Sequence, residues 1–371
     1  MLREACIIAA HDEAMRRQYY CAASRGEALD LFRPHIPPHS INGAMMFTRQ
    51  SKSTLGYIPL LAALVLALGS SRSIATSTTP KITRLPSLTM GCSDYVSCGF
   101  PSAVNTGVLK GTTLKPISGG PDGLTITQDG TVIDGADITG WVNVNANNVT
   151  IRNSRISTTG YWGIMLSEGH SGLKVLNCTI VGVVGQGADN GGEDYGIANY
   201  GGPDVEIAYN DISEFAHNFA GSNGYVHDNY MHDMQAFIYG NGTDYAHLED
   251  VYDGGDDTRP LILRHNTFLD QVTGDRGETA AVYATDDFGP LSNVTIDNNW
   301  MAGGAYALYA GSRAGNNATN IHVTNNYFST VYFPNSGFYG PLGAYDPNGA
   351  GNVFVTNVFA DGPNAGQLIT P

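Results

Sequence analysis

The sequence predicts an all-β solenoid, in which short parallel strands stack coil upon coil around an apolar core. Glycine accounts for 46 of the 371 residues and only 14% of the residues are charged, a composition that disfavours helices and suits strands joined by tight turns. A short phrase of alternating apolar and polar residues also recurs along the chain, and each copy turns before an apolar residue follows. A repeat unit that cannot bury its own apolar face must stack on its neighbours.

The recurring phrase predicts one strand per coil with one face buried, because apolar and polar residues that alternate match the period of a strand. Its copies are NVTIRNSRI (148–156), LKVLNCTI (173–180), VEIAYNDI (205–212), YVHDNYM (225–231), LILRHNTF (261–268), NVTIDNNWM (293–301), NIHVTNNYF (320–328) and NVFVTNVF (352–359). Stacking the copies predicts a buried column made of Ile151, Val175, Ile207, Val226, Leu263, Ile296 and Val323.

The turn of the phrase predicts a second column, which consists mostly of asparagine. It contains Asn210, Asn229, Asn266, Asn299 and Asn326, preceded by Ser154 and Cys178 in the earlier coils. Asparagine side chains at a repeated turn can hydrogen-bond to their copies in the adjacent coils and form a ladder. Because Cys178 occupies a position in this column, we expect it to be a buried structural thiol.

The repeated phrases, across about residues 120–360, resemble the right-handed parallel β-helix superfamily of pectate lyases and related polysaccharide-acting proteins. The stretch GFPSAVNTGVLKGTTLKP (99–116), followed by GTVIDGADITGWVNVNANNVTIRNSRI (130–156), is similar to the opening of secreted, mostly uncharacterised members. The resemblance implies a right-handed parallel β-helix over residues 119–371 and a polysaccharide as partner. It does not fix the activity, because this fold hosts lyases, hydrolases, epimerases and non-catalytic adhesins.

The N-terminal region is expected to lie outside the solenoid. Residues 1–45 show no sustained pattern, and we expect them to come from a start assigned too far upstream. Residues 46–75 have the layout of a secretory signal peptide, with Arg49 and Lys52 before an apolar run at 55–69 and the small residues SIA at 73–75. An uncleaved membrane anchor is the alternative. We therefore expect a secreted, extracellular protein with no stable membrane insertion after signal cleavage.

Residues 76–118 are expected to form a lead-in and cap, in which Cys92 and Cys98 are close enough in sequence for a small-loop disulfide. The formal net charge of −15 leaves no basic face to release counterions, so nucleic acid is excluded as a partner. We expect a monomer.

A second strand per coil carries the predicted binding face. The candidate strands are GIMLS (163–167), GIANY (196–200), NFAGS (218–222), DVYDG (250–254), AVYATD (281–286), ALYAG (307–311) and GAYDP (343–347). Aligning their apolar residues places Ile164, Ile197, Phe219, Val251, Val282, Leu308 and Ala344 inside. The next position then faces outward, and in the last four coils it is Tyr252, Tyr283, Tyr309 and Tyr345.

A row of exposed tyrosines spaced by one coil suits a sugar chain, because aromatic faces stack on the C–H faces of pyranose rings and the hydroxyls hydrogen-bond to sugar hydroxyls. The alternative is an outward face that a long loop shields. The acidic stretch AHLEDVYDGGDDTRP (246–260) contains one of these strands, so its charges are predicted beside the tyrosines. His217 from the preceding coil is expected to join them as a substrate-binding residue.

Three chemistries fit these residues, and a merely solvated acidic loop is the fourth possibility. The resemblance favours a Ca²⁺-assisted lyase that acts on a uronate-containing glycan, with oxygen ligands from Glu249, Asp250, Asp253, Asp256 and Asp257. Its catalytic residues would be His247 or Arg276 as the base, assisted by Arg264 and Asp250. A hydrolase would instead use two carboxylates among Asp250, Asp253, Asp286 and Asp287. A non-enzymatic adhesin would bind glycan, or Ca²⁺ alone, on the same face.

Overall fold

The computed structural model describes residues 93–120, 123–187, 193–236, 247–255, 258–271, 278–313 and 318–371. The chain divides into the units Met1–Pro86 and Ser87–Pro371, and all described residues belong to the second. The predicted upstream segment and signal peptide therefore lie outside the described residues. No helix among the residues that are described has the length and apolar character needed to span a membrane.

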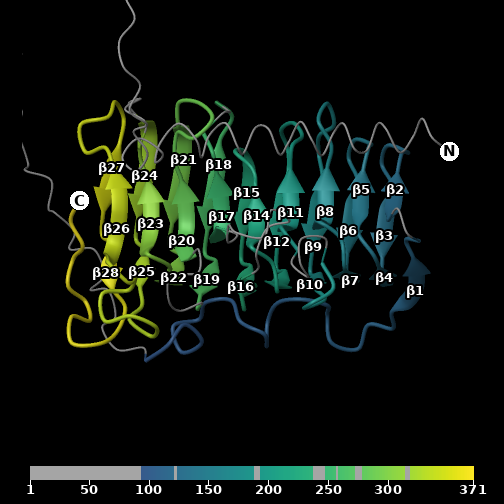
Figure 1. Cartoon of the computed structure of the whole chain (residues 1–371), viewed down its shortest axis with the longest axis horizontal. Coiled ribbons are helices and arrows are strands. Elements are labelled where there is room, and N and C mark those ends of the chain that lie inside the picture. The colour runs from purple at the N-terminus through teal and green to yellow at the C-terminus, as the bar shows by residue number, and fades with distance from the viewer. Residues whose placement is uncertain are drawn as a thin grey trace, which may run out of the picture. The chain divides into compact units, whose positions relative to one another are not determined.

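Three sheets of parallel strands build the second unit (Figure 1). Sheet A consists of β1 (Lys115–Ser118), β4 (Ala136–Thr139), β7 (Arg155–Thr158), β10 (Thr179–Gly182), β13 (Asp211–Ser213), β16 (Tyr230–His232), β19 (Thr267–Asp270), β22 (Trp300–Gly303), β25 (Tyr327–Phe328) and β28 (Val358–Phe359). Sheet B consists of β2 (Leu124–Ile126), β5 (Val142–Val144), β8 (Trp162–Leu166), β11 (Tyr195–Asn199), β14 (His217–Ala220), β17 (Leu248–Asp253), β20 (Glu278–Ala284), β23 (Tyr306–Ala310) and β26 (Gly340–Tyr345). Sheet C consists of β3 (Val132–Asp134), β6 (Thr150–Arg152), β9 (Lys174–Leu176), β12 (Glu206–Ala208), β15 (Gly224–His227), β18 (Leu261–Arg264), β21 (Ser292–Asp297), β24 (Thr319–Thr324) and β27 (Val353–Val355).

Each coil contributes one strand to each sheet, in the chain order A, B, C, and every strand pairs with the equivalent strand of the next coil. The coils are stacked along the long axis of Figure 1. The predicted fold class is confirmed, because this arrangement is a parallel β-helix. Its first strand, β1, begins at Lys115, within the segment assigned to the lead-in, and pairs in parallel with β4.

The predicted inward column of sheet C is confirmed residue by residue. The strands pair Ile151 with Val175, Val175 with Ile207, and so on in register to Val323, and every member is fully buried. The inward column of sheet B is correct from Ile164 to Leu308. Burial of these branched apolar side chains, at roughly 25 cal/mol per Å², is the main stabilising contribution in such a core.

The asparagine column forms the expected ladder between sheets C and A. Asn266 is typical: its Oδ1 accepts from the backbone N–H and the Nδ2 of Asn229 at 3.0 Å each, and its own Nδ2 donates to the carbonyl of Val226 at 3.0 Å. The ladder runs one coil beyond the prediction, to Asn357. Cys178 precedes Asn210 in the ladder and is fully buried, and burial raises the pKa of its thiol to about 12. The thiol is therefore neutral and structural.

The lead-in crosses the outer face of sheet A, along the lower edge of Figure 1. Tyr95 stacks on Tyr230 with the ring centroids 5.7 Å apart, and Thr267 Oγ1 donates to the carbonyl of Pro101 at 2.7 Å. Cys98 is disulfide-bonded, and its predicted partner Cys92 lies outside the described residues. The lead-in thus packs against strands that lie more than a hundred residues further along the chain.

Candidate functional site

Three of the predicted tyrosines form a continuous row on the outer face of sheet B. Tyr252 pairs in register with Tyr283, and Tyr283 with Tyr309. The rings of Tyr252 and Tyr283 are stacked, with centroids 5.6 Å apart, and those of Tyr283 and Tyr309 are 5.2 Å apart. The row follows from the parallel register, which places equivalent residues of successive coils directly beside one another.

The middle of the row is less accessible than the sequence suggests. Tyr252 and Tyr309 are half-buried, whereas Tyr283 is only 3% exposed. Arg313 Nη1 donates to the Tyr283 hydroxyl at 2.6 Å, and this hydroxyl donates to Asp287 at 3.2 Å. Burial raises the pKa of Tyr283, so its hydroxyl stays protonated. Burial of this face is therefore local: it covers Tyr283 and leaves Tyr252 and Tyr309 partly accessible.

The expected fourth member, Tyr345, does not belong to the row. The pairing of β23 with β26 shifts between Leu308 and Tyr309, so Leu342, and not Ala344, lies beside Leu308. Tyr345 then pairs with Ala310 and packs on the core, with its ring 5.1 Å from that of Phe354. This placement corrects the prediction, because the register shift in the last coil moves Tyr345 off the outward column.

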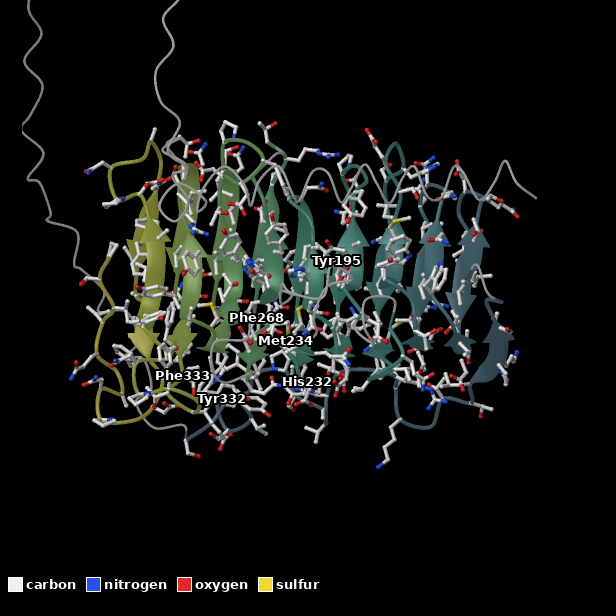
Figure 2. The ribbon with its side chains drawn as sticks, in the orientation of Figure 1. Tyr195, His232, Met234, Phe268, Tyr332 and Phe333 are labelled. Atoms are coloured by element: carbon white, nitrogen blue, oxygen red, sulfur yellow. The ribbon has the colours of Figure 1, made fainter. Side chains whose placement is uncertain are left out.

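The row continues towards the N-terminus through His217 and Tyr195. The His217 ring lies 5.5 Å from that of Tyr252, and Tyr195 stacks on the other side of His217 at 5.1 Å. His217 Nδ1 is 2.8 Å from Glu249 Oε2, and both side chains are buried. Tyr195 lies near the middle of the coil stack in Figure 2, between its two ends. The sequence placed His217 and Glu249 near this face but gave no signal for Tyr195.

Glu249 and Asp250 point to opposite faces of the same strand. The position of Asp250 aligns with Asn218 and Gly196 in the preceding coils. A side chain at Gly196 would meet the core residues Ile212 and Phe215, so this position faces the interior. The next residue of β17, Val251, also faces the core, so two successive residues point inward and the strand bends at this point. Glu249, which precedes them, lies on the outer face beside His217.

Asp250 is therefore inside the solenoid and not on the groove wall where the sequence placed it. It is fully buried and accepts a hydrogen bond from Asn218 Nδ2 at 2.8 Å. Burial raises the pKa of Asp250 well above its ordinary value. A fully buried carboxyl on the inward side of the strand is out of reach of a cation or a substrate on the outer face, and this corrects its assignment as a catalytic and metal-binding residue.

The other predicted carboxylates hold the turns after the strands. Asp253 is buried and accepts from the backbone N–H of Gly255 at 2.9 Å. Asp286 is buried and accepts from Ser312 Oγ and the backbone N–H of Arg313, at 2.6 Å each. Asp287 alone among these three is exposed, and it accepts from the hydroxyls of Tyr252 and Tyr283.

The predicted basic residues are not gathered at one point. His247 lies at the edge of the face, with its side chain 71% exposed and Nδ1 4.0 Å from Glu249 Oε1. Arg264 lies on β18 in sheet C, where Nε donates to Asp297 at 3.1 Å, so it is not part of the sheet B face. Arg276 lies outside the described residues.

The predicted calcium ligands are likewise dispersed. Glu249 faces outward, Asp250 faces inward, and Asp253 holds a turn. Asp256 and Asp257 lie outside the described residues. Within the described ranges, no group of three or more His, Cys, Asp or Glu side chains is placed to hold a metal ion. Binding of Ca²⁺ stays a prediction.

The sequence did not single out Arg313, which completes the site. Its guanidinium lies over the rings of Tyr283 and Tyr309, 5.8 and 5.7 Å from their centroids, and its side chain is exposed. It follows the outward tyrosine of β23 by four residues, after a turn, and no periodic pattern marks such a position. The outer face of sheet B therefore combines aromatic rings, a buried His–Glu pair, one exposed carboxylate and one exposed guanidinium.

Comparison with known proteins gives no assignment at the level of a family. No family model matches the chain, and no curated protein matches it. Among solved structures, the chain is similar to the catalytic unit of a thermostable GH87 α-1,3-glucanase from Streptomyces thermodiastaticus strain HF3-3, with 19% identity, a TM-score of 0.34 and coverage of 63% of this chain. The chain spans 50% of the length of that structure. A similarity of this size does not extend to the activity.

Proposed function

We propose that the protein is a carbohydrate-active enzyme that binds a polysaccharide along the outer face of sheet B. The row Tyr195, His217, Tyr252, Tyr283 and Tyr309 carries the proposal, because it crosses five successive strands with neighbouring rings 5.1 to 5.6 Å apart. Tyr252, Tyr283 and Tyr309 are in register on strands that repeat every ~4.8 Å, and His217 and Tyr195 extend this track from a position three residues earlier in their strands. Aromatic rings and hydroxyls on such a track suit the C–H faces and hydroxyls of linked sugar rings.

An acidic glycan fits this face better than a neutral one. The exposed guanidinium of Arg313 lies over the two C-terminal rings of the row. A guanidinium offers two parallel N–H groups to a carboxylate, which makes it a suitable partner for a uronate. Asp287 accepts from the hydroxyls of Tyr252 and Tyr283 and thereby orients them.

We propose β-elimination as the reaction, with His217 as the proton acceptor. Imidazole is a common proton acceptor in enzymes, and Glu249, whose Oε2 lies 2.8 Å from Nδ1, would stabilise the imidazolium that forms. The proton moves from C5 of the uronate to His217, and the electron pair of the C–H bond forms the C4=C5 double bond. The C4–O bond breaks, and the leaving oxygen takes a proton from water. The hydroxide that this leaves takes the proton from His217, which restores the neutral imidazole. A requirement for Ca²⁺ is a separate proposal, which is tested by measuring whether a chelator abolishes the elimination activity.

Hydrolysis is the second candidate, because two carboxylates flank Tyr252. Glu249 contacts His217, whose ring lies beside that of Tyr252, and Asp287 accepts a hydrogen bond from the Tyr252 hydroxyl. Glycoside hydrolases use two carboxylates on opposite sides of the scissile bond. A non-enzymatic glycan-binding protein would use the same aromatic row without turnover.

The test is a product assay on the purified full chain with polyuronates and neutral glucans. Elimination creates an unsaturated product that absorbs in the ultraviolet, and we expect this signal to disappear in His217→Ala and to persist in the matched control Arg264→Ala on sheet C. New reducing ends without absorbance would replace elimination by hydrolysis. Glycan binding without either signal would leave a binding protein. Absence of binding across the panel would overturn the proposal.

A further inference from the structure

A cavity lies on sheet A, where the lead-in crosses it, and it belongs to a different sheet from the aromatic row. Its volume is about 490 Å³, within the range of about 300–1,000 Å³ for small-molecule sites. Tyr95 of the lead-in forms one wall, Tyr230 and Trp300 of β16 and β22 form the floor, and Tyr332 lies after β25. Figure 2 shows Tyr332 and His232 at the lower edge, where the lead-in passes in Figure 1.

The floor of the cavity carries a polar atom that lacks a partner. Trp300 lines the cavity and is only 1% exposed, and its indole Nε1 has no acceptor within hydrogen-bond distance in the described part of the chain. Buried donors are almost always paired, because a donor removed from water without an acceptor loses its hydrogen bond to water. The floor of the cavity therefore carries an indole N–H that has no acceptor among the described residues.

Carboxylates line the same cavity. Asp233 has a side chain that is 60% exposed, and its Oδ2 lies 2.7 Å from His232 Nδ1. His232 Nε2 lies 2.9 Å from Asp211, so one imidazole sits between two carboxylates. Burial disfavours the charged imidazole, but the hydrogen bonds that its N–H groups donate to Asp211 and Asp233 outweigh burial and raise the pKa of His232. Asp361 accepts from Ser329 Oγ and from the backbone N–H of Thr330.

These groups define what the occupant must offer. A suitable occupant offers an acceptor for the indole N–H of Trp300, donors for the exposed carboxylate of Asp233, and an apolar face for the aromatic rings. A sugar ring offers all three, because each hydroxyl both donates and accepts and the C–H groups form an apolar face. An organic ammonium suits aromatic rings and carboxylates, but it has no acceptor for the indole.

We propose that this cavity is a second saccharide-binding site, which holds one sugar ring of a glycan separately from the sheet B face. The inference does not rest on the proposed catalytic function, because the cavity is formed by sheet A and the lead-in. Simultaneous occupation of both sites by one polymer raises the effective concentration of glycan at sheet B. The lead-in is then a functional part of the protein, because Tyr95 supplies one wall.

The test measures binding of hexasaccharides of galacturonate, glucose and N-acetylglucosamine by calorimetry, in a Tyr252→Ala/Tyr309→Ala background that weakens binding to sheet B. We expect at least one hexasaccharide to bind, and expect Trp300→Phe and Asp233→Asn each to weaken it at least tenfold. Trp162→Phe is the matched control, because this tryptophan already donates to Asn143 at 3.0 Å, and we expect a change below twofold. At saturating glycan, where a higher effective concentration no longer matters, cleavage by the otherwise unaltered protein should change less than twofold in Trp300→Phe.

The outcomes separate this site from the sheet B proposal. If the unaltered protein cleaves none of the substrates but Trp300→Phe weakens hexasaccharide binding tenfold, the catalytic proposal is overturned and the cavity proposal is supported. Hexasaccharide affinities that neither Trp300→Phe nor Asp233→Asn changes would overturn the cavity proposal. Binding of tetramethylammonium that Asp233→Asn weakens, without saccharide binding, would also overturn it in favour of a cation site. If Trp300→Phe does not fold, as judged by circular dichroism, Asp233→Asn and Tyr332→Ala decide.

Discussion

His217 Nδ1 and Glu249 Oε2 lie 2.8 Å apart on adjacent strands of sheet B, with side chains only 4% and 1% exposed. Two ionisable groups in such a position depend on each other, because removal of one leaves the other buried without a partner. The pair is therefore both a structural element of the coil and the centre of the proposed chemistry.

Replacement of Glu249 tests both roles at once. We expect Glu249→Gln to lower the free energy of unfolding by about 3 kcal/mol, because a buried partner is lost, and to lower kcat at least ~100-fold, because the proton acceptor is no longer stabilised. Glu206→Gln is the control: Glu206 pairs with the half-exposed Lys174 at 2.6 Å, and loss of such a pair costs about 1 kcal/mol or less. Urea unfolding and initial rates measure the two effects. A stable and fully active Glu249→Gln variant would remove the pair from the mechanism.

The aromatic row predicts different effects for neighbouring tyrosines. Tyr252 is half-buried and faces solvent, so we expect Tyr252→Ala to weaken glycan binding by about 1 kcal/mol, roughly fivefold in Kd, with little loss of stability. Tyr283 is 3% exposed, so Tyr283→Ala should lower the free energy of unfolding by about 3 kcal/mol. Tyr225→Ala on sheet C is the control for binding. Equal effects of Tyr252→Ala and Tyr225→Ala on Kd would contradict a binding role for the row.

The repeat made most of the fold predictable. Residues such as Val226 and Asn266 recur at fixed positions in each coil, and a parallel solenoid converts that recurrence into columns without further information. Tyr252 and Tyr283 followed from the same rule. Tyr345 did not, because the register of the last coil shifts by a local irregularity that alternation alone does not reveal.

The site was less predictable for two physical reasons. A bend at the start of the sheet B strands places two successive residues inward, so the alternation that put Asp250 near the groove fails there, and Glu249 takes the outward position. The sheet A cavity depends on Tyr95 meeting Tyr230, a contact between segments 135 residues apart that no local pattern encodes. Periodicity identifies columns, whereas bends and long-range packing decide which side chains meet.

The asparagine ladder should be costly to interrupt. In Asn266→Ala, the backbone N–H and Nδ2 of Asn229 lose their acceptor and the carbonyl of Val226 loses its donor, all in the interior. Unsatisfied buried groups cost about 1–3 kcal/mol each, so we expect a loss of at least about 3 kcal/mol in urea unfolding. Asn145→Ala is the control, because Asn145 is exposed and its side chain accepts, among the described residues, from Ser167 Oγ alone; we expect a loss within about 0.5 kcal/mol. Similar losses for both variants would mean that the ladder is not a special source of stability.

Asp228 predicts how stability responds to acid. Burial would raise its pKa, but hydrogen bonds from His227 and His265, at 2.7 and 2.6 Å, prevail and lower the pKa to about 2. A carboxyl whose pKa is lower in the folded than in the unfolded state stabilises the protein above the unfolded value, near pH 4, and this contribution disappears as the pH falls towards 2. The shift corresponds to about 2 kcal/mol. In urea unfolding between pH 4.5 and 2, we therefore expect the unaltered protein to lose about 2 kcal/mol more than Asp228→Asn, whose amide does not titrate and tolerates the positive φ of 55° at this position. Parallel curves for the two proteins would show that the two imidazoles do not hold the Asp228 carboxylate in its charged form.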